Sequence, residues 1–378
     1  MAKYVIIALL LVLCAGGHSL VPAHPMYQEI PDAWQATRIE ALRNFTPNRN
    51  SSFENSDLSS GALQQANPTK NNEKTSALPQ NILALMVQFS DVSFKAMPQA
   101  PDYLVHDRVF FERWMLHLQD FYTDASHGRY LMNYTVHPQV LTLPHSMSFY
   151  GNDTSEKIDK LLPQILTDLM PLCDQQIDFS QYQGLIIFHA GTGQESDIDG
   201  IRTNQIWSTF LTRKLLQSYY DPDNDSYPGF STGDGAILTN VVIVSEDEFQ
   251  DYFPPPESED HDSYLFSIFG VLAHQFGHVL GLPTLFDNDS SNGKSQGIGN
   301  WGLMGTGVWN ANGYVPAQLS AWCRYYLGWE DAVELHHSAE DLVIDHFLNH
   351  QEGAIRLYKL PISRSEEHTS ELQSPNTI

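Results

Sequence analysis

The feature that most constrains this chain is an apolar stretch, VLAHQFGHVLG at 271–281, that contains two histidines. Apolar residues recur at helical spacing around it, and a glycine and a proline follow, so the pattern predicts one helix over 264–280. His274 and His278 are four residues apart, which places both imidazoles on one helical face. Two neutral imidazoles at this spacing can coordinate one zinc ion. The alternative interpretation is that the two histidines are simply packed in the core.

Two neighbouring features favour the metal site over the packed pair. Gly281 follows His278 at the spacing where the chain of a zinc-peptidase motif turns sharply. The later segment WGLMG at 301–305 contains Met304, which we expect in a methionine turn beneath the metal. The combination is more specific than either histidine alone.

The rest of the chain alternates apolar runs with helical patterns, which predicts an α/β domain. Expected strands cover 81–89, 184–190 and 236–244, with a further strand or hairpin at 130–143, and expected helices cover 109–122 and 156–173. The stretch 24–78 is rich in Asn, Ser, Gln and Pro and is interpreted as a low-complexity linker or pro-region.

Acidic residues gather at three places outside the histidine helix. Glu246, Asp247 and Glu248 follow the strand at 236–244, and we expect an exposed helix start there. Alternating carboxylates can bind Ca²⁺, although a solvated acidic turn is the preferred interpretation; they are Asp221, Asp223 and Asp225. The third group follows His189 and comprises Glu195, Asp197 and Asp199. We interpret these residues as carboxylates that cap a turn, with a functional site as the alternative.

Longer motifs resemble the immune inhibitor A family of secreted zinc metallopeptidases. The chain reads HQFGHVLGLPTLFD and then GIGNWGLMGTGVWNANGYVPAQLSAWCRYYLGW, against the family pattern HExxHxxGLPDLYD, a WxLM segment, P-x-x-LSAW and LGW. Upstream segments also match, including DFYTDASHGRY at 120–130 and IIFHAGTGQES at 186–196. The resemblance covers roughly residues 80 to 330.

The resemblance implies a zincin-like fold, in which a mixed twisted sheet packs on helices and the His274–His278 helix forms the floor of a cleft. A small C-terminal subdomain would carry Met304 beneath the site. The implied cofactor is Zn²⁺ held by His274 and His278, and the implied reaction is hydrolysis of peptide bonds in protein or peptide substrates.

Two departures fall on the positions that matter most for this chemistry. The family has Glu where this chain has Gln275, and a carboxamide is not basic enough to act as general base. The family has Asp as third metal ligand where this chain has Thr284, whose neutral hydroxyl is a poor zinc ligand. Asp287 in the same loop is a substitute ligand or an ordinary turn carboxylate. We therefore predict weak or lost peptidase activity, with a non-catalytic peptide- or protein-binding module as the alternative.

The ends and the charge set the remaining expectations. Residues 1–23 have the basic start, apolar run and small residues of a secretory signal peptide, which predicts an extracellular protein with no membrane anchor once the signal is removed. We expect the peptidase-like domain at 79–335 and the start of a C-terminal region at 336–363, while 364–378 resembles a translated sequencing adapter. Lys plus Arg is 20 and Asp plus Glu is 45, a net charge of −25 that argues against nucleic acid as a partner.

The sequence leaves open whether Cys173 and Cys323 form a disulfide, and no feature of the sequence specifies an oligomeric state.

Overall fold

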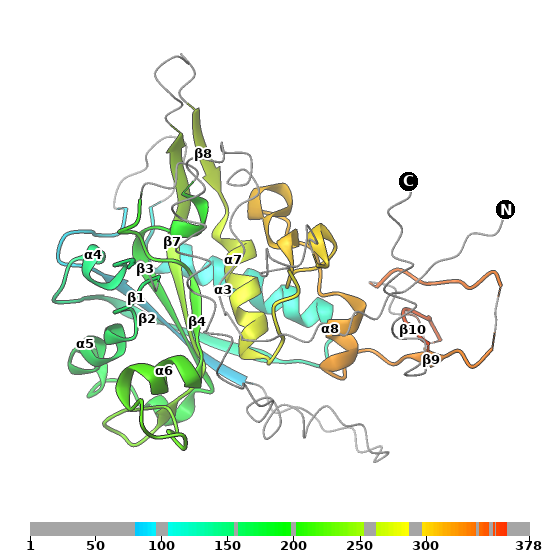
Figure 1. The fold of residues 1–378 in the computed structure, drawn as a ribbon, viewed down its shortest axis with the longest axis horizontal. Helices are drawn as coiled ribbons and strands as arrows, with labels where there is room; N and C mark the ends of the chain where they lie inside the picture. Colours follow the sequence, from blue (N-terminus) through cyan, green and yellow to red (C-terminus); the bar gives the residue numbers. More distant parts are fainter. Residues whose placement is uncertain are drawn as a thin grey trace.

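The core of the protein is a six-stranded mixed sheet in the order β2-β1-β3-β7-β4, with β8 paired to β7 (Figure 1). The computed structural model describes residues 80–95, 105–154, 158–197, 202–252, 262–286, 297–337, 340–347, 351 and 353–360. Four strands run parallel, namely β1 (Gln80–Gln88), β2 (Met132–Thr142), β3 (Gly184–Thr192) and β7 (Val241–Tyr252). Two run antiparallel to β7, namely β4 (Thr209–Leu211) and β8 (Asp262–Phe266).

Helices cover both faces of the sheet, so the domain has three layers (Figure 1). Alternate residues of β1 point to opposite faces, with Ala84 and Met86 in one core and Leu83 and Leu85 in the other. The first core is closed by α3 (Arg108–Ala125) and α7 (Ile268–Val279). The second is closed by α4 (Met147–Tyr150), α5 (Gln164–Cys173) and α6 (Arg213–Tyr220). Strands that are buried on both faces explain the unbroken apolar runs of the sequence.

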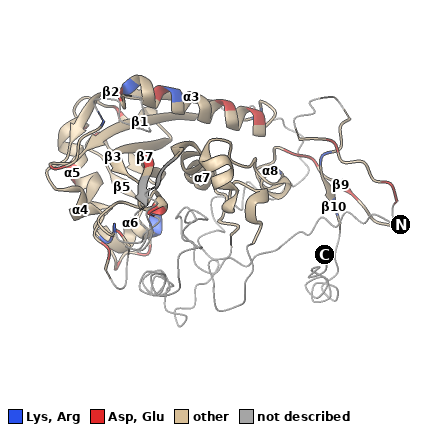
Figure 2. Cartoon of the chain, turned by 90° about the horizontal axis from the view of Figure 1, so that it is seen from above, with Lys and Arg blue, Asp and Glu red and all other residues tan. Residues whose placement is uncertain are grey.

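The helix α3 shows how the sequence selects its local structure. The Asp107 side chain accepts a hydrogen bond from the Phe110 N–H and caps the helix start. Its apolar residues face the first core, while Figure 2 shows acidic and basic residues along its outer face. Arg108 and Glu112 pair there at 2.8 Å with i,i+4 spacing. One apolar stripe and one charged face fix the side on which the helix packs.

Several predicted elements are confirmed and three have different bounds. The strands at 81–89 and 184–190 and the helix at 109–122 are present, and 130–143 forms one strand, β2. The predicted helix 264–280 is wrong in its first turn, because β8 runs to Phe266 and α7 begins at Ile268. The helix predicted from 156 begins only at Gln164, and the strand predicted at 236–244 is split into β6 (Ile237–Leu238) and β7.

The exposed helix start predicted at Glu246, Asp247 and Glu248 is wrong. These residues continue β7 and are 1%, 3% and 0% exposed. Buried carboxylates need donors, and the fold supplies them from distant parts of the chain. The Gly191 N–H donates to Glu246 Oε1 at 2.7 Å, and Lys95 Nζ pairs with Asp247 Oδ2 at 2.8 Å.

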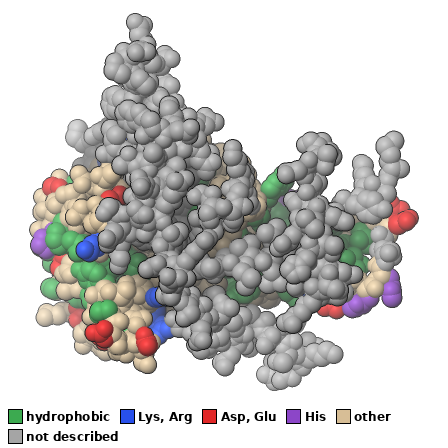
Figure 3. All heavy atoms as spheres, in the orientation of Figure 1, with side chains coloured by type: hydrophobic (Ala, Val, Ile, Leu, Met, Phe, Trp, Pro, Cys, Tyr) green, Lys and Arg blue, Asp and Glu red, His purple; other side chains and the backbone are tan. Residues whose placement is uncertain are grey.

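Short elements complete the described chain. They are η2 (Phe179–Gln181), η3 (Gln194–Ser196), β5 (Phe230–Ser231), η4 (Gly299–Trp301), η5 (Thr306–Gly313), α8 (Ala321–Tyr326), β9 (Val333–Glu334) and β10 (Tyr358–Lys359). Cys173 and Cys323 are free, buried in different cores, and so do not form a disulfide. None of the described helices combines the length and apolarity that a membrane crossing requires. Figure 3 shows hydrophobic, polar and charged side chains mixed over the described part of one face, with few Lys and Arg.

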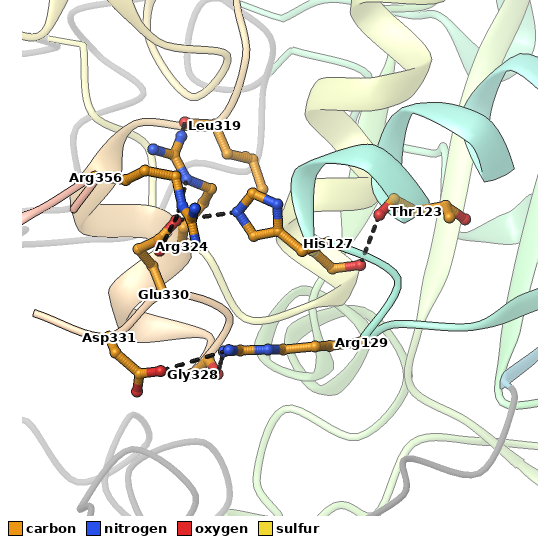
Figure 4. Close-up of polar contacts among 10 residues, drawn as sticks. Thr123, His127, Arg129, Leu319, Arg324, Gly328, Glu330, Asp331 and Arg356 are labelled. Carbon is orange, nitrogen blue, oxygen red and sulfur yellow. Dashed lines mark hydrogen bonds and ion pairs between the residues drawn. The ribbon is translucent and has the colours of Figure 1, made fainter. Parts of the chain in front are cut away.

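A buried glutamate ties the C-terminal segment to the body of the domain (Figure 4). Glu330 accepts from Arg356 Nε at 3.0 Å and lies 3.1 Å from His127 Nε2 and 3.6 Å from Arg324 Nε. These partners come from the turn after α3, from α8 and from the segment before β10. A cavity of about 480 Å³ lies beside them, between Arg129 and Arg356. It is separate from the two histidines of α7, which do not line it.

Candidate metal site

The helix α7 carries both histidines in the interior of the protein. The Ser267 hydroxyl accepts from the Phe269 N–H and caps the helix start. From Ile268 to His278 every side chain position is buried, because the sheet lies on one side of α7 and η5 on another. His274 is 0% exposed and His278 is 8% exposed.

The two imidazoles are fixed in the same way, each by one backbone carbonyl. His274 Nδ1 lies 2.8 Å from the Leu303 oxygen, and His278 Nδ1 lies 2.8 Å from the Leu282 oxygen. A carbonyl can only accept, so each Nδ1 carries the proton and each Nε2 presents a lone pair. Neither Nε2 has a hydrogen-bond partner among the described residues, although both atoms are buried. The ring centroids are 5.0 Å apart.

This arrangement fits the chemistry of a metal-binding histidine pair. Metal-ligating imidazoles commonly donate their other N–H to a carbonyl or carboxylate, which fixes the tautomer and the ring orientation. Burial, together with the neighbouring His278, lowers the pKa of His274 to about 3. Burial lowers the pKa of His278 to about 4. Both rings are therefore neutral and able to ligate at physiological pH.

The segment that contains Met304 packs directly against this helix. A Cβ added to Gly277 would lie 2.5 Å from Met304 Sδ, so the glycine is what allows the sulfur to approach the helix between the histidines. Leu303 supplies the acceptor for His274, and the Met304 carbonyl accepts from the Leu285 N–H at 2.7 Å. Gly281, with φ of 86°, turns the chain out of α7 in a conformation that favours glycine.

Gln275 points toward the edge strand of the sheet. Its Nε2 donates to the Ser208 carbonyl at 2.9 Å, and Ser208 directly precedes β4. The bond links α7 to the sheet across 67 residues of sequence. The other amide atom, Oε1, is buried and has no hydrogen-bond partner among the described residues. Sequence reasoning did not predict this contact.

The third-ligand positions are only partly described. Thr284 is half-buried and lies between Leu282, whose carbonyl accepts from His278, and Leu285, which bonds Met304. Its part of the chain therefore runs beside the histidines. Asp287, the predicted substitute ligand, falls outside the described residues, as does Asp199.

The other acidic groups lie away from the two histidines in different surroundings. Within the described chain, His106, Glu246 and Asp247 form the one group of three potential ligands within 4.8 Å, but Lys95 already pairs with Asp247. The loop of Asp221, Asp223 and Asp225 forms no such group, so the structure does not support Ca²⁺ there.

The residues around His189 also differ from the expected capping turn. His189 is fully buried, its Nδ1 lies 2.9 Å from the Ala190 oxygen, and burial lowers its pKa to about 4. Asp197 accepts from the Arg202 N–H at 2.8 Å, as a capping carboxylate would. Glu195 is buried instead of exposed in a turn.

Metal binding is expected to change little with pH over a wide range. Because the pKa values of His274 and His278 are near 3 and 4, protons do not compete with a metal ion above about pH 5. Two histidines with the ordinary pKa of about 6.5 would lose about 10³-fold in affinity between pH 8 and pH 5. Titration with Co²⁺ from pH 8 to 5 should give less than about tenfold change, and a loss above about 100-fold would contradict the buried neutral pair.

The comparisons with known proteins converge on one family. Residues 262–330, which include α7, match the catalytic domain described as immune inhibitor A peptidase M6. The chain is 25% identical over 284 residues to Immune inhibitor A of Bacillus thuringiensis subsp. alesti, which covers 63% of this chain and 38% of that protein. It is 28% identical over 147 residues to Pre-pro-metalloprotease PrtV of Vibrio cholerae, which covers 38% of this chain and 13% of that protein.

The chain therefore spans well under half the length of these relatives. The matched segment contains both histidines, Gln275 and Met304, so the likeness falls on the site itself. Taken with the geometry of α7, these matches show that the chain is similar to the immune inhibitor A family of peptidases in the segment that carries the histidine pair.

Proposed function

We propose that this protein is a secreted member of the family that binds Zn²⁺ through His274 and His278 and hydrolyses peptide bonds weakly or not at all. One observation carries the metal part: two buried imidazoles on one helical face each donate Nδ1–H to a carbonyl, and neither Nε2 has a partner in the part of the chain that the structure describes. Zinc, when bound, supplies Lewis-acid polarisation of a substrate carbonyl. The packing of Met304 against Gly277 supports a methionine turn beneath the ion.

The residues around the pair support the loss of activity. Gln275 offers an amide where a general base is needed, and its Nε2 is engaged with the Ser208 carbonyl. Thr284 offers a neutral hydroxyl where a third anionic ligand is needed. A positioned general base contributes about 10²- to 10⁴-fold to a reaction, so its absence alone makes turnover slow. The proposed substrates are proteins or peptides, in keeping with the family.

The alternative function is a secreted module that holds a peptide or protein segment without cutting it. The observation that favours it is the satisfied Gln275–Ser208 bond, because an amide at this position stabilises the contact between α7 and β4 without any need for catalysis. Slow, chelator-sensitive turnover would favour the first function, whereas tight binding of an unfolded peptide without turnover would favour the alternative.

The test measures zinc content and hydrolysis in the same preparations. The natural chain should bind one equivalent of Zn²⁺, and His274→Ala and His278→Ala should each abolish stoichiometric binding, since each removes one of two histidine ligands. His336→Ala, at an exposed histidine, is the control and should bind like the natural chain. Strong chelator-sensitive cleavage of unfolded protein would defeat the prediction of lost activity. Unchanged zinc binding in His274→Ala would defeat the metal site.

A further inference from the structure

Two buried glutamates lie behind Gln275, on the sheet side of the histidine helix. Glu195 belongs to η3 and Glu248 belongs to β7, and they are 1% and 0% exposed. Glu195 Oε2 accepts from the Ser208 N–H at 3.1 Å, and Glu248 Oε1 accepts from the Ser245 hydroxyl at 2.8 Å. Each carboxyl group therefore has one oxygen held by a protein donor.

The second oxygen of each carboxyl group indicates that the pair holds a proton. Glu195 Oε1 and Glu248 Oε2 are buried, and neither has a hydrogen-bond donor among the described residues. The two carboxyl groups nevertheless interact electrostatically, and the Glu248 carboxyl lies against the backbone at Gly193, two residues before Glu195. Ionised carboxylates only accept, so two of them in contact repel, whereas one proton between them makes one group a donor to the other.

The surroundings of the pair do not replace that proton. Asp247, on the same strand, adds a like charge that disfavours ionisation of Glu248. Ser245 is the hydroxyl donor to Glu248, whereas the Ser196 hydroxyl donates to the Gly193 carbonyl at 3.2 Å and the Ser208 hydroxyl has no hydrogen-bond partner among the described residues. The nearby cation Lys95 is paired with Asp247 at 2.8 Å. Within the described part of the chain, no neighbouring cation therefore offsets the burial of the two carboxyl groups, and burial favours the protonated form of the pair.

The pair reaches the histidine helix through one residue. Ser208 donates its N–H to Glu195 and accepts from Gln275 Nε2 at its carbonyl. The same residue leads into the edge strand β4. The position of the Gln275 amide, next to His274 in the chain, thus depends on where Glu195 holds Ser208.

We propose that Glu195 and Glu248 share a single proton and that this protonated pair positions Gln275 through Ser208. All the groups involved belong to the protein, so the inference holds whether or not zinc binds and whether or not the protein cuts peptides. Glu195 and Glu248 are positioning residues, because they act on Gln275 through Ser208 and not on the metal ligands themselves.

The pair gives the fold a pH dependence of defined sign. Burial is the main cause that raises the pKa of Glu195 and Glu248 above 4.5, so the folded state holds a proton that the unfolded chain releases. The pair's contribution to stability is complete below about pH 4.5 and is lost as pH rises through the raised pKa of the pair. Within that window the folding equilibrium constant falls by about tenfold per pH unit.

The first test compares urea unfolding of the metal-free natural chain and Glu248→Gln from pH 4.5 to 9. The glutamine amide is a permanent donor to Glu195, and its oxygen still accepts from Ser245, so the tenfold-per-unit fall should disappear relative to the natural chain. Glu195→Gln should do the same, with its oxygen accepting from Ser208. Asp331→Asn, at a side chain 95% exposed, is the control and should follow the natural chain. Parallel pH curves for the natural chain and both glutamine variants would overturn the shared proton.

The second test asks whether the pair positions Gln275. The side-chain amide signal of Gln275 in ¹⁵N-glutamine-labelled protein, assigned by its loss in Gln275→Met, should shift at the pH where the fall seen in urea unfolding levels off, because the folded pair loses its proton there. The shift should be absent in Glu248→Gln, because that variant keeps its donor at every pH. A signal that does not move in the natural chain, or that moves equally in Glu248→Gln, would overturn the positioning role.

Discussion

The double variant Gln275→Glu with Thr284→Asp is expected to hydrolyse unfolded protein about 10²- to 10⁴-fold faster than the natural chain. The glutamate would take a proton from the attacking water and return it to the leaving amine. The aspartate would add an anionic third ligand to the two imidazoles, whose Nε2 atoms have no hydrogen-bond partner among the described residues. The measurement is turnover of a denatured protein substrate with and without a chelator.

Single variants separate the two contributions. Thr284→Asp alone should raise zinc affinity without restoring turnover, because position 275 still lacks a base. Gln275→Glu alone should gain less than the double variant, because its zinc is weakly held. Adding His274→Ala to the double variant should remove the gained activity. A folded, zinc-loaded double variant without any gain would contradict the assignment of these two positions.

The Gln275→Glu change also has a structural cost that the contact with Ser208 defines. The amide Nε2 donates to the Ser208 carbonyl at 2.9 Å, whereas an ionised glutamate has no proton to donate. A buried carbonyl without a donor costs about 1–3 kcal/mol. We therefore expect the variant to lose more stability than the natural chain between pH 5 and neutral pH in urea unfolding, because only the protonated carboxyl group is again a donor.

The sequence was sufficient to predict what local pattern encodes. The histidine pair on α7 follows from spacing alone, and the strands β1 and β3 follow from unbroken apolar runs. The boundary between β8 and α7 was missed because apolar residues continue from the strand into the helix. Ser267 was an available signal, since a serine before a helical pattern is a common cap.

The sequence was insufficient where partners are distant in the chain. The acidic run at 246–248 resembles an exposed helix start, and its burial in β7 depends on Lys95 and Gly191, which lie 151 and 55 residues from Glu246. The contact between Gln275 and Ser208 spans 67 residues. Such donors become visible only when the sheet brings β1, β3 and β7 together, because charge in a single sequence is by default assigned to the surface.

The largest stability effect is expected for Gly270→Ala, in the first half of α7. Alanine is favoured over glycine in an open helix by about 1 kcal/mol, so any loss must come from packing. A Cβ at Gly270 would lie 2.0 Å from the Val308 oxygen and 3.3 Å from the Gly313 Cα, which are both backbone atoms of η5. Backbone cannot rotate aside, so we expect a net loss of about 3 kcal/mol in urea unfolding.

Gly277→Ala on the same helix is the matched control, because its obstacle is a side chain. Its Cβ would meet Met304 Sδ at 2.5 Å, and an unbranched thioether can adopt another rotamer. We expect a loss within about 1 kcal/mol. Met304→Ala should relieve the cost of Gly277→Ala but not that of Gly270→Ala, which a double-mutant cycle measures. Equal losses for the two glycine variants, or no coupling between 277 and 304, would contradict this packing.

Zinc affinity should rank the two glycine variants in the reverse order of stability, with the larger loss of affinity in Gly277→Ala. The new Met304 rotamer changes the packing beneath the adjoining Leu303 carbonyl, which holds His274 Nδ1 at 2.8 Å, and so loosens the orientation of the imidazole. Loss of such an orienting contact typically weakens metal affinity by about 10- to 100-fold. Gly277→Ala should therefore bind zinc less tightly while remaining nearly as stable as the natural chain. Gly270→Ala lies a full helical turn before His274, so below its unfolding transition it should keep most of its affinity. A variant that loses metal without losing stability would separate the orientation of the imidazoles from the integrity of the helix that carries them.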